Sequence, residues 1–189
     1  MSNNRPKIGL AFSGGSGRAI ANIGILEVLQ ENNIPVDYIS ACSSGTVIAA
    51  SFACDTMGNL KQTLLKLDRG SFFRLLNFDS QGGGLFNLDK AEDVFREFTL
   101  GKRFEEVRPL LTFVAYDIEN TEPVSLRLGD LARACRISCS VPLWFTPVRW
   151  GNRVLVDGGL FSIVPVQEVR DMGADIVLGV DIAATRQVI

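Results

Sequence analysis

The amino-acid sequence predicts an α/β fold in which a mostly parallel central sheet carries helices on both faces. Short apolar runs of strand length alternate with segments whose apolar residues recur at helical spacing. Several of the apolar runs end in turns that contain glycine or aspartate. The 189 residues, 47% hydrophobic and 21% charged, have the composition of a globular domain, and no repeat or linker divides them. We therefore expect residues 1–189 to form a single domain.

Six segments have the pattern of strands. The first and the last are apolar nearly throughout and are expected to be buried, whereas the fourth is expected at an edge of the sheet. The first ends in the glycine loop 13–17, from which a helix should follow. The predicted strands are residues 7–12, 37–41, 111–116, 124–128, 153–156 and 175–180.

Five segments have the pattern of helices. Ile20, Ile23, Leu26 and Leu29 recur every three residues, with polar residues on the other face. The segment that begins at Ser43 is apolar on all sides, which predicts a buried helix. The predicted helices lie within residues 20–31, 43–54, 88–98, 131–139 and 166–172.

Composition excludes several classes of function. The chain has no histidine, so neither a Ser-His-Asp nor a Cys-His catalytic set can form, and no imidazole can bind a metal. The net charge of −2 argues against a broad basic surface for nucleic acid. The four cysteines form no CxxC pair, which favours buried thiols in a reducing cytosol and no metal site. No apolar run approaches the roughly 20 residues of a membrane span. We expect a cytoplasmic protein, with peripheral membrane contact left open.

The turn Ala41-Cys42-Ser43-Ser44-Gly45 is a candidate nucleophile site. It joins a predicted strand to a predicted helix, with Ser43 at the apex and a glycine two residues later, a pattern that resembles a nucleophile elbow. Small flanking residues allow the strained turn that exposes a serine hydroxyl. A serine before a helix is also a common N-cap, so that structural alternative stays open.

The glycine loop offers donors for an anion. Backbone N–H groups of Gly14, Gly15 and Ser16 lie between a strand and a helix start, where they can face a developing oxyanion. A phosphate loop is the alternative, although the loop lacks the third glycine of a dinucleotide site and the Gly-Lys-Ser/Thr of a P-loop. Arg18 is expected to anchor the loop, or to contact an anionic head group of a substrate.

Without histidine, the base that activates a serine must be a carboxylate, a lysine or a tyrosine. Asp117, Asp157 and Asp181 each follow a predicted strand. Gly158 and Gly159 favour Asp157, because they remove side-chain bulk and let a carboxylate approach its neighbours closely. A plain Asp-Gly turn is the structural alternative.

Together these motifs resemble the patatin-like phospholipases, over about residues 7–166. The resemblance rests on Ser13-Gly14-Gly15-Ser16-Gly17-Arg18, on the Ser43 turn, on Asp157-Gly158-Gly159-Leu160 and on residues 134–148. It implies a three-layer patatin-like fold and a lipid acyl hydrolase with a Ser-Asp dyad. Ser43 would be the nucleophile, Asp157 the general base, and Gly14, Gly15 and Ser16 the oxyanion hole. No cofactor or metal is implied, and the substrate would be a lipid or another ester.

The sequence departs from the family pattern at four positions. Ser16 and Ala41 stand where the family usually has glycine, Ala19 where it commonly has glycine, and Asn22 where it often has histidine. A catalytically impaired domain that binds lipid or a partner protein is therefore the first rival hypothesis, and a nucleotide-binding domain is the second. The sequence indicates no oligomeric state.

The segment 71–86 combines bulky apolar residues with three consecutive glycines. The glycines allow flexibility that an ordinary core segment does not need. We expect Phe72, Phe73 and Phe86 to line or cover an acyl-binding site and to touch membranes, the alternative being that the segment belongs to the core.

Overall fold

The computed structural model describes residues 5–66, 68, 70, 77–79 and 84–182. Its centre is a seven-stranded sheet in which four neighbouring strands are parallel and three further strands are antiparallel. The strand order is β10 (Ile176–Val180), β1 (Ile8–Phe12), β2 (Tyr38–Ala41), β5 (Leu110–Asp117), β9 (Arg153–Asp157) and β8 (Val148–Trp150), with β6 (Glu122–Leu126) beside β5. The expected α/β class and central parallel sheet are thus confirmed.

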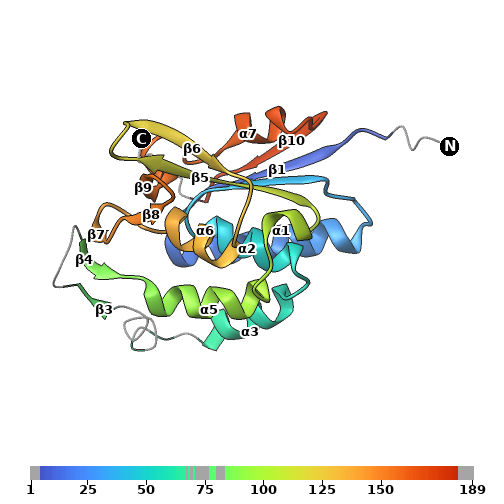
Figure 1. Ribbon diagram of the computed structural model, residues 1–189. Coiled ribbons are helices and arrows are strands. Elements are labelled where there is room, and N and C mark those ends of the chain that lie inside the picture. The colour runs from blue at the N-terminus through green and yellow to red at the C-terminus, as the bar shows by residue number, and fades with distance from the viewer. Residues whose placement is uncertain (1–4, 67, 69, 71–76, 80–83, 183–189) are drawn as a thin grey trace, which may run out of the picture.

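Helices cover both faces of the sheet (Figure 1). One face carries α1 (Ala21–Glu31), α2 (Ser44–Ala53) and α6 (Leu131–Ser138), and α7 (Val166–Asp171) covers the other. Outside α2 and α6 lie α3 (Met57–Lys66) and α5 (Asp89–Thr99). Short 3-10 helices occur at η1 (Ser16–Ile20), η2 (Phe104–Glu106) and η3 (Gly158–Leu160).

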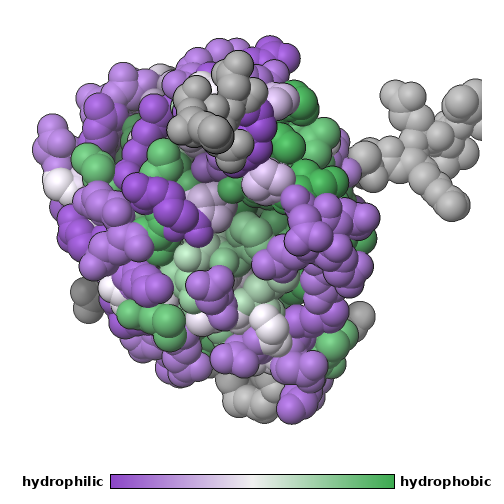
Figure 2. Space-filling view, turned by 90° about the vertical axis from the view of Figure 1, so that its right-hand side faces the viewer, coloured by the Kyte–Doolittle hydropathy of each residue, from purple (hydrophilic) through white to green (hydrophobic). Residues whose placement is uncertain are grey.

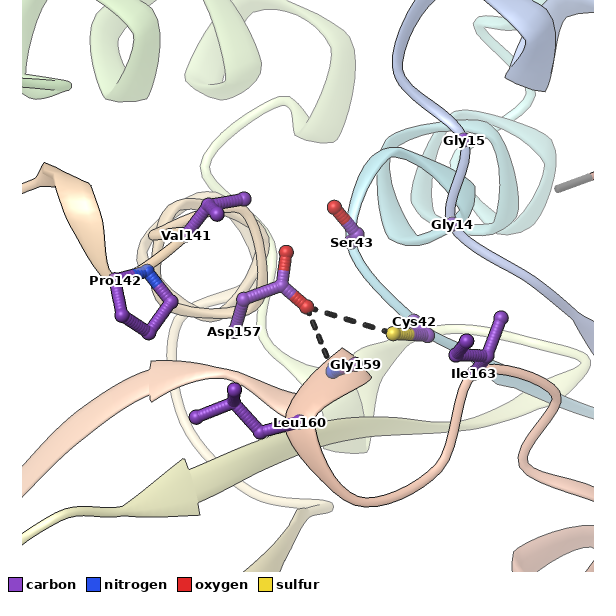
Figure 3. Close-up of a pocket in the computed structure, with 10 residues that line it drawn as sticks. All are labelled: Gly14, Gly15, Cys42, Ser43, Val141, Pro142, Asp157, Gly159, Leu160 and Ile163. Carbon is purple, nitrogen blue, oxygen red and sulfur yellow. Dashed lines mark hydrogen bonds between the residues drawn. The ribbon is translucent and has the colours of Figure 1, made fainter.

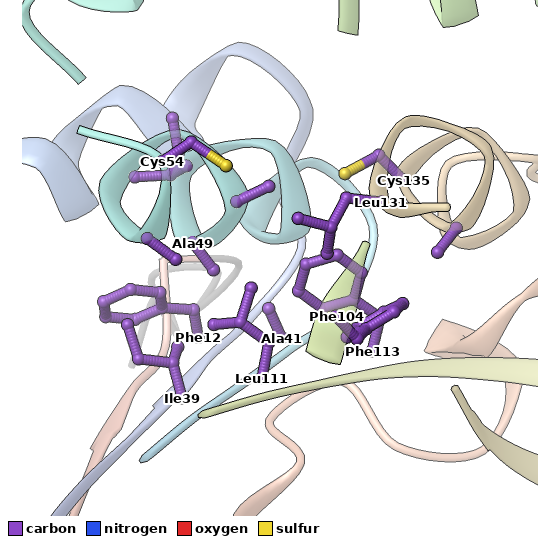
Figure 4. Close-up of a cluster of buried hydrophobic side chains, with 14 of the residues drawn as sticks. Phe12, Ile39, Ala41, Ala49, Cys54, Phe104, Leu111, Phe113, Leu131 and Cys135 are labelled. Carbon is purple, nitrogen blue, oxygen red and sulfur yellow. The ribbon is translucent and has the colours of Figure 1, made fainter. Parts of the chain in front are cut away.

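The main core lies between the sheet and the helices α2 and α6 (Figure 4). Phe12, Ile39 and Phe113 project from the sheet, and Cys54 and Cys135 face each other from the two helices. These side chains are buried, as the apolar periodicity of the strands and helices requires. The cysteines thus serve as small core residues, and all four are free thiols.

The antiparallel half of the sheet brings two strand ends together. On one side of β5, residues 110–113 pair with β2 in parallel, and residues 115–117 pair with β9 in the antiparallel direction. The carboxyl ends of β2 and β9 therefore meet head to head, separated along β5 by Val114 alone. The residues that follow these two strands are Cys42 and Gly158, so Ser43 and Asp157 approach one another from opposite directions.

Several features differ from the sequence-based expectations. β10 is an edge strand rather than a buried one, and Ile176 and Leu178 on it are 44% and 42% exposed. A second sheet, made of β3 (Asn77–Phe78), β4 (Gly84–Asn87) and β7 (Leu143–Phe145), was not expected, nor was α3. Phe72 and Phe73 lie outside the described residues.

The amino ends of the parallel strands form the face shown in Figure 2. This face is mostly hydrophilic, with apolar residues in its middle and along one side. The carboxyl ends of the same strands, where Ser43 lies, are on the opposite side of the molecule. Among the described helices, none has the length and apolar character that crossing a bilayer requires.

Candidate active site

Ser43 occupies a sharp turn between β2 and α2. Its backbone has φ 49° and ψ −132°, an unusual conformation for a residue other than glycine. The turn is tight, because a Cβ at Gly45 would come within 2.8 Å of the carbonyl oxygen of Ser13. Ser43 stands at the N-cap position of α2, yet its side chain makes no capping hydrogen bond. The hydroxyl is therefore left available, as in a nucleophile elbow.

Asp157 ends β9 and faces Ser43 across the mouth of a cavity (Figure 3). The residue is only 5% exposed, and its Oδ1 accepts a hydrogen bond from the backbone N–H of Gly159 at 2.8 Å. The thiol of Cys42 donates to the same oxygen at 3.5 Å. Both donors hold one carboxylate oxygen, so the other is left to face the Ser43 hydroxyl.

The other two candidate carboxylates lie elsewhere. Asp117 is fully buried and accepts hydrogen bonds from the backbone and side chain of Asn120, and it pairs with Arg153 at 3.3 Å. Asp181 is exposed beyond β10. Neither lines the cavity that contains Ser43. Of the three aspartates, the fold brings Asp157 to the serine.

Burial sets the protonation behaviour of the site. Desolvation raises the pKa of Asp157 above its usual value, against the opposing effects of the Gly159 N–H, the Ser43 hydroxyl and the Cys42 thiol. A higher pKa makes the carboxylate a better match for proton transfer near neutrality. Burial and the negative charge of Asp157 also raise the pKa of Cys42 far above its usual value, which keeps this residue a neutral thiol. Cys42 is therefore a hydrogen-bond donor here and a poor nucleophile.

The glycine loop runs directly beside the serine. A Cβ at Gly14 would lie 2.7 Å from the Cβ of Ser43, so only glycine allows this approach. The backbone N–H of Gly14 interacts with the sulfur of Cys42 and lowers the pKa of that thiol. Gly14 and Gly15 line the cavity, whereas Ser16 is exposed with φ 54° and lies outside the lining. Arg18 is also exposed, and its Nε donates to the carbonyl oxygen of Gly15 at 3.4 Å, which anchors the loop.

The end of α6 connects the two candidate catalytic residues, a role that sequence reasoning missed. The Oγ of Ser138 accepts the backbone N–H of Ser43 at 2.9 Å and donates to the carbonyl oxygen of Val114 at 2.7 Å. The carbonyl oxygen of Ser140 accepts the backbone N–H of Asp157 at 2.9 Å. Segment 138–140 thus fills the gap between β2 and β9. Residues 134–148 contributed to the family resemblance, but no local pattern assigned a role to Ser138 or Ser140.

The cavity has a volume of about 310 Å³ and a mainly apolar wall. It is open to solvent, and the Ser43 hydroxyl and the Asp157 carboxylate lie on one side of it (Figure 3). Phe86 does not contribute to it; its ring packs edge to face against Phe78 in the small sheet, with centroids 6.2 Å apart. The lining residues are Gly14, Gly15, Cys42, Ser43, Val141, Pro142, Asp157, Gly159, Leu160 and Ile163.

The departures from the family pattern fit the backbone at two positions. Ala41 lies within β2, fully buried and paired with Phe12 and Phe113, and it has no positive φ. Ala19 is buried in η1, also without a positive φ. Asn22 is fully buried in α1, and its amide group has no hydrogen-bond partner among the described residues.

A comparison with protein families matches residues 10–170 to the patatin-like phospholipase model. An uncharacterised NTE family protein of Mycobacterium tuberculosis is 25% identical over 95% of this chain and 50% of its own length. A patatin-like phospholipase domain-containing protein of Caenorhabditis elegans is 27% identical over 95% of this chain and 14% of its own. Lysophospholipase NTE1 of Cryptococcus neoformans is 27% identical over 94% of this chain and 11% of its own. The chain thus spans half or less of these relatives.

Among solved structures, VipD from Legionella pneumophila has a similar fold. The TM-score is 0.67 with 13% sequence identity, over 85% of this chain and 47% of VipD. At this identity the likeness concerns the fold alone.

Proposed function

The chain belongs to the patatin-like phospholipase family, and from that premise we propose that it hydrolyses carboxylic esters of lipids with Ser43 as nucleophile and Asp157 as general base. The observation that carries the proposal is the meeting of β2 and β9 on β5, which places a strained serine and a buried carboxylate of raised pKa at one cavity. The name lysophospholipase, which the Cryptococcus relative carries, is consistent with an acyl ester as substrate.

In the first half-reaction, the free oxygen of Asp157 takes the proton of the Ser43 hydroxyl while the serine oxygen attacks the acyl carbonyl carbon. The carbonyl oxygen becomes an oxyanion. The loop that contains Gly14, Gly15 and Ser16 supplies its donors. The Gly14 N–H interacts with Cys42 and Ser16 lies outside the cavity lining, so the N–H of Gly15 is the best placed of the three. The proton then passes from Asp157 to the departing alcohol oxygen, and the acyl group remains on Ser43.

In the second half-reaction, Asp157 takes a proton from water, whose oxygen attacks the acyl carbon. The bond to Ser43 breaks, the serine oxygen regains a proton from Asp157, and a free fatty acid leaves. Cys42 and Gly159 hold Oδ1 throughout, so the carboxylate keeps its orientation. The apolar wall of the cavity suits an acyl chain.

Active-site labelling tests the proposal. A fluorophosphonate should modify the parent at Ser43, identified by mass spectrometry of the peptide, and Ser43→Ala should abolish both labelling and ester turnover. Ser44→Ala is the matched control, because the Ser44 Oγ has no hydrogen-bond partner among the described residues. Asp157→Asn should reduce turnover nearly as far as Ser43→Ala, since asparagine cannot accept the proton.

Two outcomes would contradict the proposal. Labelling at Ser44 or Cys42 would place the nucleophile elsewhere. A folded parent that neither reacts nor turns over esters would instead support the rival hypothesis of an impaired domain that binds lipid or a partner.

A further inference from the structure

Two uncharged segments border the cavity that contains Ser43. Residues 137–148 and 158–167 include no lysine, arginine, aspartate or glutamate. Val141 and Pro142 of the first segment and Leu160 and Ile163 of the second line the cavity. Both segments therefore border the same cavity, although β8 and β9 separate them along the chain.

Apolar side chains of these segments project into solvent around the opening. Their exposed fractions lie between 40% and 82%, and each of them lines the cavity or lies within two residues of one that does. We name this group the apolar rim; its members are Val141, Leu143, Trp144, Leu160, Phe161 and Ile163. Exposed apolar side chains gathered beside one cavity mark an interaction site on a folded protein.

Leu143 is held outward by an unusual backbone. Its φ is 71°. A bulky residue rarely adopts a positive φ, and backbone strain of this kind is concentrated at functional sites. It is also the most exposed large apolar residue in the described part of the chain, at 82%. The fold thus holds Leu143 in a strained backbone conformation that leaves its side chain exposed, next to the exposed Trp144. That arrangement has no benefit in water.

The position and chemistry of the rim favour one kind of partner. Because the rim borders the opening to Ser43, a protein seated on it would block the cavity, whereas a lipid phase that contains the substrate would supply it. Protein interfaces usually have charged or polar borders, and the two segments supply no charge. Aromatic and aliphatic side chains are those that enter the boundary between lipid head groups and acyl chains.

We infer that the apolar rim docks on the surface of a phospholipid bilayer, so that the cavity opens directly onto the lipid phase. This inference rests on the proposed function only for the benefit of docking; the surface itself is independent of Ser43. Since the rim has no basic residue, binding depends on apolar insertion rather than on anionic lipid. The docking surface therefore differs from the segment 71–86 that the sequence suggested.

Vesicle flotation tests the inference directly. The protein is used with the Ser43→Ala change, so that hydrolysis does not alter the vesicles, which contain phosphatidylcholine with or without phosphatidylserine. Paired Leu143→Ser and Trp144→Ser changes should weaken partitioning at least about tenfold, given the apolar area withdrawn from the lipid. Phe161→Ser, from the other segment, should also weaken it, and phosphatidylserine should have little effect.

Leu100→Ser is the matched control. Leu100 is 59% exposed and has a φ of 53°, as Leu143 is exposed with a positive φ, but it lies at the far end of α5. This change should leave partitioning within about twofold of the parent's, because Leu100 lies outside the rim. Thermal unfolding of each variant checks that the fold persists.

Three results would overturn the inference: a parent that does not bind vesicles, a paired variant that binds as well as the Leu100→Ser protein, or a dimer in solution that the paired changes dissociate. Turnover of a short soluble ester by the protein with Ser43 intact separates the two proposals. Turnover without vesicle binding would sink only the docking surface, and vesicle binding without turnover would sink only the hydrolase.

Discussion

Replacing Ser138 with alanine removes the oxygen that joins β5 to the nucleophile turn. Ser138 is fully buried, and its Oγ bonds both the Ser43 N–H and the Val114 carbonyl oxygen. Alanine leaves these two backbone groups without partners in a dry environment. Each such loss costs about 1–3 kcal/mol, so the two together should lower the free energy of unfolding by about 2–6 kcal/mol.

Activity should fall further than stability alone explains. The Ser43 N–H bond helps to hold a backbone with φ 49°, and its loss lets the turn relax. A displacement of about 1 Å of a reacting group can cost roughly 100-fold in rate, so kcat should drop by about 10- to 100-fold at temperatures where the variant is folded. Urea denaturation gives the first quantity, and turnover of a short soluble ester gives the second.

Ser140→Ala is the control for this experiment. Ser140 is equally buried, but its Oγ donates only to the carbonyl oxygen of Arg136 in α6, and its own carbonyl bond with Asp157 survives the change. We expect a smaller loss of stability, about 1 kcal/mol, and a nearly unchanged kcat. If both variants lost stability and kcat equally, Ser138 would have no special role at the nucleophile turn.

Three further predictions concern titration. Cys42→Ala removes a hydrogen-bond donor that lowers the pKa of Asp157, so the acid limb of the pH profile of kcat/KM should move to higher pH. Cys42→Ser should restore the position of that limb. A limb that does not move in Cys42→Ala would exclude Cys42 as a donor that tunes Asp157. Because burial raises the pKa of Asp157, stability falls as the pH rises from the unfolded-state pKa of this carboxyl to its higher folded-state pKa. The melting temperature of Asp157→Asn should therefore exceed the parent's at neutral pH and equal it at acid pH; a variant that is less stable at neutral pH would refute the argument. The pKa of Asp117 is instead lowered, chiefly by the hydrogen bond from Asn120, so the stability that this carboxylate contributes is present at neutral pH and lost on acidification. Asp117→Asn should therefore lower the melting temperature at pH 7 but not at acid pH. If the folded Asp117→Asn protein no longer hydrolysed esters, the assignment of Asp157 as the base would be contradicted.

The sequence predicted the parts of the site that are local. Ser43 follows a short predicted strand, and Asp157 precedes two glycines. Both patterns extend over only a few consecutive residues, so the sequence alone reveals them. The glycine loop beside Ser43 was likewise expected, and Gly14 shows why a side chain is not tolerated there. The central alternation of strands and helices was predicted for the same reason, since burial imposes its period on each segment.

The parts that the sequence did not predict depend on contacts between distant segments. No local pattern says that β9 runs against β5 while β2 runs with it, because direction is decided by pairing. Ser138 resembles any serine near a helix end, and only the gap at Val114 gives it two partners. The outward position of Leu143 depends on a single backbone angle, which an apolar run does not reveal. β10 looked buried because apolar composition does not distinguish an edge from a centre.

The head-to-head meeting on β5 also divides the proposed catalytic pair between two halves of the chain. The exposed turn at residues 118–121 joins β5 to β6, with Ser43 before it and Asp157 after it. A chain cut between Asn120 and Thr121 yields one fragment with a serine but no base, and another with a base but no serine. Under the proposed mechanism each fragment alone is inactive, because Asp157 reaches Ser43 only when β9 pairs with β5. Ester turnover on mixing such fragments would report their reassembly, and a ribosome-bound chain would stay inactive until β9 has emerged and paired.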